Sequence, residues 1–111
     1  MGKNRTADLL QGALELLVLR LLRSRPLNGW DIMHRLQLAS GDVLTVTAGS
    51  LYPALHRLEA RGLVSAAWQL SENNRRARVY RLTAAGRRQL ATERETWARF
   101  SGAVDALLRN A

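Results

Sequence analysis

The apolar residues of this chain change their spacing near position 63, and that change limits the folds open to it. Before this position they recur at helical spacing, whereas from Leu63 onward they alternate with polar residues, as in a half-buried strand. One run contains Val64, Ala66, Trp68 and Leu70, and a second contains Tyr80 and Leu82. The polar segment at residues 71–76 lies between the two runs and is typical of a turn. The pattern therefore predicts several helices followed by a β-hairpin.

Two helices are expected near the N-terminus. Asp8 is a candidate N-cap for a helix over residues 9–23, whose apolar residues wrap most of the cylinder. A turn containing Pro26 separates it from a second helix over residues 29–39, and residues 43–46 form a short β-prone piece. A first helix that is apolar nearly all round needs cover on two sides, and another subunit is a plausible source of the second cover.

A third helix follows. Thr47 is a good N-cap for a helix that reaches about Arg61, with Gly62 as the residue just beyond its end. One narrow inward stripe consists of Leu51, Leu55 and Leu58. Pro53 falls inside this helix unless the helix begins later, near Ser50, which would place the proline in the first turn.

The last segment predicts a long helix, capped by Thr83 and free of proline to residue 111. Such a helix is about 42 Å long at 1.5 Å per residue, and it overhangs a domain of this size. Its a/d seam consists of Leu90, Trp97, Phe100, Val104 and Leu107. Leu14 and Leu17 of the first helix add apolar surface, which favours a dimer over an intramolecular core helix. We expect residues 1–83 to form one domain and residues 84–111 a C-terminal dimerisation helix.

The composition excludes several classes of protein. A chain of 111 residues fits one compact domain, and without cysteine it has no disulfide scaffold, Cys-ligated zinc or thiol nucleophile. The two histidines, His34 and His56, are too few for a zinc site. Ser50 and His56 lie six residues apart on one helix and point in different directions, so they form no catalytic pair. We expect no enzyme, no metal and no cofactor.

No membrane or export segment is expected. Residues 9–22 form the longest apolar-rich stretch, which is too short and too charged to span a bilayer. No small-residue cleavage site follows a clean apolar stretch, so a signal peptide is not expected either. These observations predict a cytoplasmic protein without a membrane partner.

The net charge of +8 comes from arginine, which supplies sixteen of the seventeen cations. Because guanidinium binds phosphate in a bidentate fork, nucleic acid is the first partner to consider and an anionic membrane surface the second. Residues 56–88 hold eight arginines against two glutamates, a net charge of +6. The order helix–helix–helix–hairpin predicts a winged helix-turn-helix, mainly α with a small β-hairpin. The charge therefore lies on the segments that such a fold turns toward DNA.

Candidate DNA contacts lie on the hairpin, which is the wing, and on the third helix. The wing candidates are Asn73, Asn74, Arg75, Arg76 and Arg78, of which the arginines suit phosphate or minor-groove contact. The two asparagines have an alternative role in satisfying the turn. The third helix offers Ser50, Tyr52, His56 and Arg57. Arg57 is the best candidate for a bidentate contact with guanine, although a solvated surface side chain is the alternative for each residue alone.

A specific run in the third helix resembles the PadR family of bacterial transcriptional regulators. It reads Gly49-Ser50-Leu51-Tyr52-Pro53-Ala54-Leu55-His56-Arg57-Leu58-Glu59. The likeness continues at residues 61–64 and 72–86, and residues 10–17 and 26–32 are also similar, with Trp30 where many members have Tyr. The resemblance implies a dimeric winged-helix repressor that binds a palindromic or dyad operator. It also implies that Ser50, Tyr52 and Pro53 are recognition-helix positions.

Two other functions stay open beside operator binding. Some small members of the family bind planar aromatic or phenolic effectors between subunits, which makes Trp97 an effector candidate as well as a core residue of the seam. A winged helix can also bind RNA or protein. Because only six residues are aromatic, too few for a single-strand reader that stacks bases, double-stranded DNA is the preferred partner.

Overall fold

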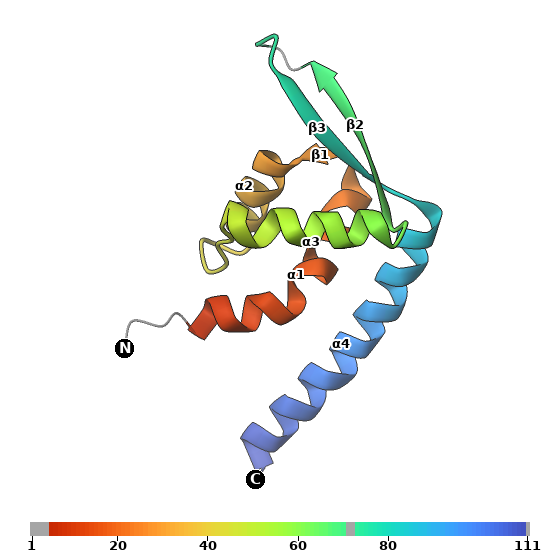
Figure 1. Cartoon of the computed structure of the whole chain (residues 1–111). Helices are drawn as coiled ribbons and strands as arrows, with labels where there is room; N and C mark the ends of the chain where they lie inside the picture. Colours follow the sequence, from red (N-terminus) through yellow and green to blue (C-terminus); the bar gives the residue numbers. More distant parts are fainter. Residues whose placement is uncertain (1–4, 71–72, 111) are drawn as a thin grey trace.

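The architecture is a helical core from which a β-hairpin and a long helix project (Figure 1). The computed structural model describes residues 5–70 and 73–110. The elements are α1 Arg5–Ser24, β1 Leu27–Asn28, α2 Gly29–Ala39, α3 Ala48–Ala60, β2 Val64–Leu70, β3 Arg76–Leu82 and α4 Ala84–Asn110. The predicted fold class, mainly helical with a small β-hairpin in a winged helix-turn-helix order, is confirmed.

The strands form one antiparallel sheet in the order β1-β3-β2. The two long strands pair from Val64 opposite Leu82 to Leu70 opposite Arg76, which is the predicted hairpin. β1 pairs with the middle of β3 at Tyr80. This short strand is absent from the sequence prediction, because two residues carry no alternation that a pattern can detect.

The core consists mainly of aliphatic side chains from all four helices and from the base of the sheet, together with the ring of Tyr80. Its most deeply buried members are Leu14, Val18, Leu19, Ile32, Leu51, Leu55 and Leu58. α1 packs against α2, α3, β3 and α4 of the same chain. Much of the cover that the first helix needs therefore comes from within the chain. Leu9 is still 76% exposed, so cover of the remaining apolar surface by another subunit stays a prediction.

The predicted helix caps of α3 and α4 are confirmed. The Thr47 hydroxyl accepts a hydrogen bond from the Ser50 amide at 3.2 Å, and the Thr83 hydroxyl accepts one from the Gly86 amide at 3.0 Å. Gly62 has a φ of +73° just beyond the end of α3, a left-handed conformation that suits glycine. Short polar side chains and one glycine thus define where these helices begin and end.

Two local predictions are wrong. α1 begins at Arg5, so Asp8 lies within the helix and is not its N-cap. Residues 43–46 form no strand, and Leu44 and Val46 instead pack against the core as part of a loop. The two side chains alternate with polar residues because both are packed against the core, and this alternation does not require pairing with another strand.

Pro53 lies inside α3, because the helix begins at Ala48 and not near Ser50. Since proline has no N–H, the carbonyl of Gly49, four residues earlier, lacks its usual helical donor. Gly49 and Pro53 are both exposed, so water can reach this carbonyl.

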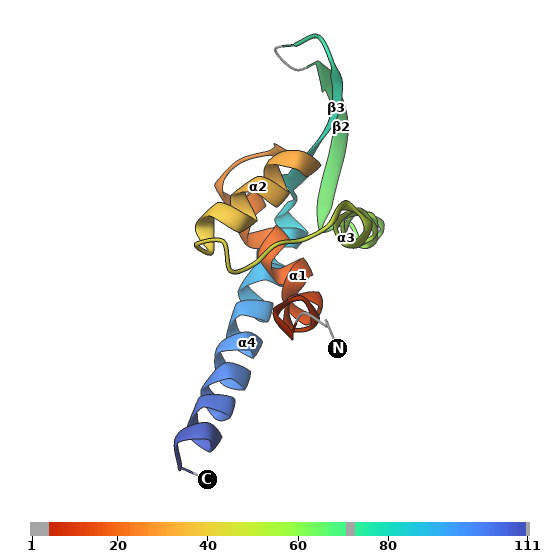
Figure 2. The same ribbon diagram turned by 90° about the vertical axis from the view of Figure 1, so that its left-hand side faces the viewer.

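α4 leaves the sheet directly, with only Thr83 between it and β3. Gly86 lies so close to the carbonyl of Leu63 that a Cβ at this position would overlap the oxygen. Gly86 and Leu90 are the buried residues of α4, so its first two turns anchor it to the core. The later turns extend away from the other helices in both views (Figures 1 and 2).

Candidate nucleic-acid interface

One side of α3 is buried in the core and the other is open to solvent. The buried side consists of Leu51, Ala54, Leu55 and Leu58. The predicted contact residues lie elsewhere on the helix: Tyr52, Pro53, His56 and Arg57 are exposed, and Ser50 is half-buried. The helix therefore presents the predicted residues on its outer surface.

The wing extends from the core as two paired strands (Figure 2). Asn73, Asn74, Arg75 and Arg76 are exposed, whereas Arg78 is half-buried. Asn74 has a φ of 59°, a left-handed conformation that asparagine tolerates. Asn74 therefore has the alternative role predicted for the two asparagines, which is to satisfy the turn. Two residues of the predicted turn, Ser71 and Glu72, lie outside the described residues.

A cleft of about 880 Å³ brings the wing together with the start of α2 and with α3. It is lined by Asn28, Gly29, Trp30, Tyr52, Trp68, Asn73, Arg75, Arg76, Ala77, Arg78 and Tyr80. Of the predicted contact residues, the cleft combines Tyr52 with Asn73 and the three wing arginines. Ser50, Pro53, His56 and Arg57 lie on α3 outside this cleft.

Tyr52 and Tyr80 shape the floor of this cleft. The Tyr52 ring lies against Gly29, where an added Cβ would overlap the phenol group, so a larger residue at the start of α2 would displace the Tyr52 side chain. Tyr80 is buried, and burial raises the pKa of its phenol more than nearby Arg78 lowers it. The Tyr80 hydroxyl therefore stays protonated at neutral pH.

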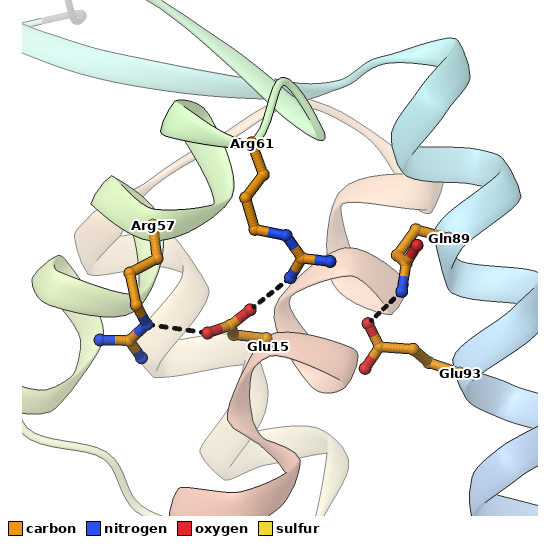
Figure 3. A network of polar contacts seen from close by, with 5 residues as sticks. All are labelled: Glu15, Arg57, Arg61, Gln89 and Glu93. Carbon is orange, nitrogen blue, oxygen red and sulfur yellow. Dashed lines mark hydrogen bonds and ion pairs between the residues drawn. The ribbon is translucent and has the colours of Figure 1, made fainter.

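Glu15 of α1 binds two arginines at the C-terminal end of α3 (Figure 3). One carboxylate oxygen lies 2.9 Å from Arg57 Nε, and the other lies 3.2 Å from a terminal nitrogen of Arg61. The Arg57 side chain is still half exposed. In the structure Arg57, the expected guanine contact, is thus paired with α1.

A second carboxylate joins the wing to α3. The Arg78 guanidinium lies 2.8 Å from Glu59 and also 6.0 Å from the centre of the Trp68 ring. Arg76 lies over the same ring at 5.0 Å. Sequence reasoning missed the roles of Glu15, Glu59 and Trp68, because each depends on a partner from another element. The available signals were Glu59, one of two glutamates among the eight arginines of residues 56–88, and Glu15, the one acidic residue of the apolar-rich stretch 9–22.

The residues of the predicted dimer surface differ in burial and form three groups. Leu14 and Leu90 lie in the core of the single chain, with 1% and 3% of their surface exposed, so they are not presented to a partner. Leu17 is half-buried. The exposed members are Trp97, Phe100, Val104 and Leu107 on α4. These four residues leave an apolar face on the projecting part of the helix.

A groove of about 590 Å³ lies between α1 and α4, beside this apolar face. Its lining is mainly apolar and includes Leu9, Leu16, Trp97 and Phe100. The Trp97 and Phe100 rings lie 5.9 Å apart and are tilted against each other. A hydrogen bond of 3.1 Å from Gln89 to Glu93 runs along the same stretch of α4 (Figure 3).

Residues 5–70 and 73–110 contain no group of three His, Asp or Glu side chains placed to hold a metal ion. Within the same residues, no helix has both the length and the apolar character needed to cross a membrane.

The order of the helices and the antiparallel sheet define a winged-helix protein. The model of the transcriptional regulator PadR-like family matches residues 18–92, and the chain belongs to this family. The structure is similar to that of a PadR family transcriptional regulator from Eggerthella lenta DSM 2243. Here the TM-score is 0.81 and the identity 30%, over 94% of this chain and 88% of that chain. The protein is therefore a transcriptional regulator, not an enzyme, as the sequence predicts.

Two relatives are similar over part of their own length. The transcriptional regulator Rv3488 of Mycobacterium tuberculosis is 49% identical over 49 residues, which cover 44% of this chain and 45% of that protein. An uncharacterized 37.1 kDa protein in transposon TN4556 of Streptomyces fradiae is 42% identical over 90 residues. That match covers 81% of this chain but only 24% of the relative.

Proposed function

We propose that this regulator binds double-stranded DNA in a sequence-specific way, as a homodimer on a dyad operator, and represses transcription by occupying that operator. In this proposal α3 enters the major groove and the wing contacts the flanking backbone. Its place of action is the cytoplasm, where a bacterial operator is found. Repression and the dyad are what the PadR resemblance implies.

The observation that carries the proposal is the cleft shared by α3 and the wing. It combines a polar aromatic side chain on α3, Tyr52, with the arginines of the wing, and the described residues of its lining include no carboxylate. Phosphate contacts give affinity without sequence information, whereas contacts from α3 to base edges supply specificity. One surface thus offers both kinds of contact.

The apolar face of α4 supports the dimer. Phe100 and Leu107 are 60% and 66% exposed, which is costly for an isolated chain in water. Their d-type spacing, together with Trp97 and Val104 at a-type positions, suits packing against a second α4. Two copies joined in this way would present two α3 helices to the two halves of a dyad.

Selection from a random duplex library tests the proposal. We expect a selected sequence with dyad symmetry, bound at least about 1,000-fold more tightly than unrelated duplex at physiological salt. Gel shifts then compare that duplex with its separated strands and with a structured RNA. Equal binding of the three would count against operator binding, tighter binding of the RNA would favour the RNA-binding alternative, and no binding to any would favour a protein-binding winged helix.

The α1–α4 groove favours a second candidate function, in which a small aromatic effector controls DNA binding. Trp97 is 46% exposed and lines the groove, so its ring is not buried in the core of the single chain and is accessible to a ligand. We propose that a planar aromatic molecule binds beside Trp97, where the second subunit covers the groove. Calorimetric titration with planar aromatic and phenolic compounds tests this, with Trp97→Ala as the comparison. Equal heats for both proteins would exclude the groove as the site.

A further inference from the structure

Two tryptophans lie at the edge of the core but are not buried in it. Trp30 at the start of α2 is 64% exposed, and Trp68 on β2 is 57% exposed. Both line the cleft between the wing and α3, away from the apolar face of α4. Exposed rings of this size indicate a surface that another molecule covers.

Neighbouring side chains hold both indole rings. Trp30 is stacked on His34, with 5.0 Å between ring centres and an angle of 15° between their planes. Trp68 lies under the guanidinium groups of Arg76 and Arg78, at 5.0 Å and 6.0 Å. Arg78 is in turn bound to Glu59 of α3. Because these contacts restrict the rings before binding, less side-chain entropy is lost when a ligand packs on them.

The cleft combines the two kinds of surface that a DNA strand presents. Arginines from the wing line one part, and apolar ring faces line another. A DNA strand alternates charged phosphates with deoxyribose rings, which are less polar, and an indole adds an N–H donor for phosphate. Because the cleft also includes Tyr52 of α3, a strand lying in it would border the groove that α3 enters.

We propose that the cleft between the wing and α3 holds one sugar–phosphate strand of the duplex, with Trp30 and Trp68 packed against deoxyribose. Arg75 and Arg76 contact the phosphates, and Arg78 keeps the wing in place through Glu59. This inference rests on the proposed DNA-binding function and adds two residues to it. The tryptophans contribute affinity that depends little on sequence and little on salt, since neither carries charge.

The test measures duplex affinity and its salt dependence for Trp30→Ala and Trp68→Ala. Each substitution removes roughly 50 Å² of apolar contact, so we expect about a tenfold loss of affinity for operator and unrelated duplex alike. The slope of log affinity against log salt should not change. Leu70→Ala is the matched control, because Leu70 is exposed on the same strand but outside the cleft.

Fluorescence provides a second readout that does not depend on a loss of binding. The double variant Trp30→Phe/Trp68→Phe keeps aromatic rings in the cleft and leaves Trp97 as the only indole. We expect duplex DNA to quench the emission of the original protein and to leave that of the double variant nearly unchanged. Equal quenching of both would overturn the inference.

The outcomes separate this inference from the proposed function. If the unaltered protein binds no duplex, the proposed function fails. If it binds a dyad duplex and both alanine variants bind within twofold of it, only the role of the two tryptophans fails. If the alanine variants lose single-strand binding but not duplex binding, the rings stack on bases, and a duplex strand is the wrong occupant.

Discussion

Two parts of this molecule extend beyond its core, the wing and the later turns of α4, and their surfaces differ. The wing exposes Arg75 and Arg76, with Trp68 held under two guanidinium groups. The projecting part of α4 exposes Phe100 and Leu107 at heptad spacing. Each segment lacks the burial that normally stabilises a strand or helix, and each has a different kind of surface to offer a partner.

The difference shows what each projection is suited to bind. A cationic hairpin suits a partner whose negative charge continues along its length, and the interaction weakens with salt. An apolar helix face suits another helix, and that interaction depends little on salt. In the proposed function the wing binds nucleic acid and α4 joins two copies of the chain, and each of these roles can be tested separately.

The largest effect is expected from a charge on the projecting face of α4. Leu107→Glu buries a carboxylate in the proposed seam and should weaken the dimer at least about 100-fold, because an unpaired buried charge costs several kcal/mol. Light scattering measures the mass directly. Ala98→Glu adds the same charge at an exposed position off the a/d pattern and should leave the mass unchanged. An unchanged mass for Leu107→Glu would contradict the assignment of α4.

Charge reversal on the wing should have the next largest effect. Arg75→Glu/Arg76→Glu removes two phosphate contacts, so duplex affinity should fall on the order of 100-fold at low salt and the salt slope by about two. All sequences should be affected alike. Arg99→Glu/Arg109→Glu makes the same change in net charge on exposed positions of α4 and should have a much smaller effect. A loss confined to the operator would mean that the wing reads bases.

A smaller effect is expected for the aromatic side chain that α3 contributes to the cleft. Tyr52→Ala should relax discrimination at particular base pairs by about 1–3 kcal/mol, measured by competition between operator variants. Tyr52→Phe retains the ring that packs against Gly29 and removes only the hydroxyl. If both variants lose discrimination equally, the hydroxyl makes the contact. If only the alanine variant does, the ring is responsible.

The smallest effect should come from releasing the arginines at the end of α3. Glu15→Gln removes the carboxylate that binds Arg57 and Arg61, so we expect duplex affinity to rise a few-fold and the salt slope to steepen. The free energy of unfolding should fall by about 1 kcal/mol or less, since both pairs are partly exposed. Weaker DNA binding would instead mean that the pairs hold α3 in its binding position.

Local signals in the sequence predict most of the fold. Thr47, Gly62 and Thr83 each act within a few residues, and each has its predicted role. The alternation on β2 predicts which residues share a face, but it does not tell how far the strand extends beyond the core. Trp68 therefore follows Val64 in parity, yet only Val64 is buried.

The candidate site is less predictable, because its arrangement depends on distant pairs. Glu15 and Arg57 are 42 residues apart, and their contact exists only after α1 packs across α3. The partly exposed pair of Arg78 and Glu59 likewise requires the wing to lie beside α3. Composition and spacing identify the arginines of this surface, but they do not tell which of these arginines form an ion pair with a carboxylate.

Thr83 lies between β3 of the wing and α4, so it joins the two segments that project from the core. Its amide donates to the carbonyl of Leu63 at 3.1 Å and its hydroxyl to that of Gly62 at 2.7 Å, at the end of α3. α4 starts at the next residue, and beyond its last buried residue, Leu90, it extends as a lever for about 30 Å, so that its far end moves about 2.6 Å for each five degrees of rotation. In the proposed dimer, the crossing angle of two such levers would therefore set the distance between the DNA half-sites that the two copies bind together.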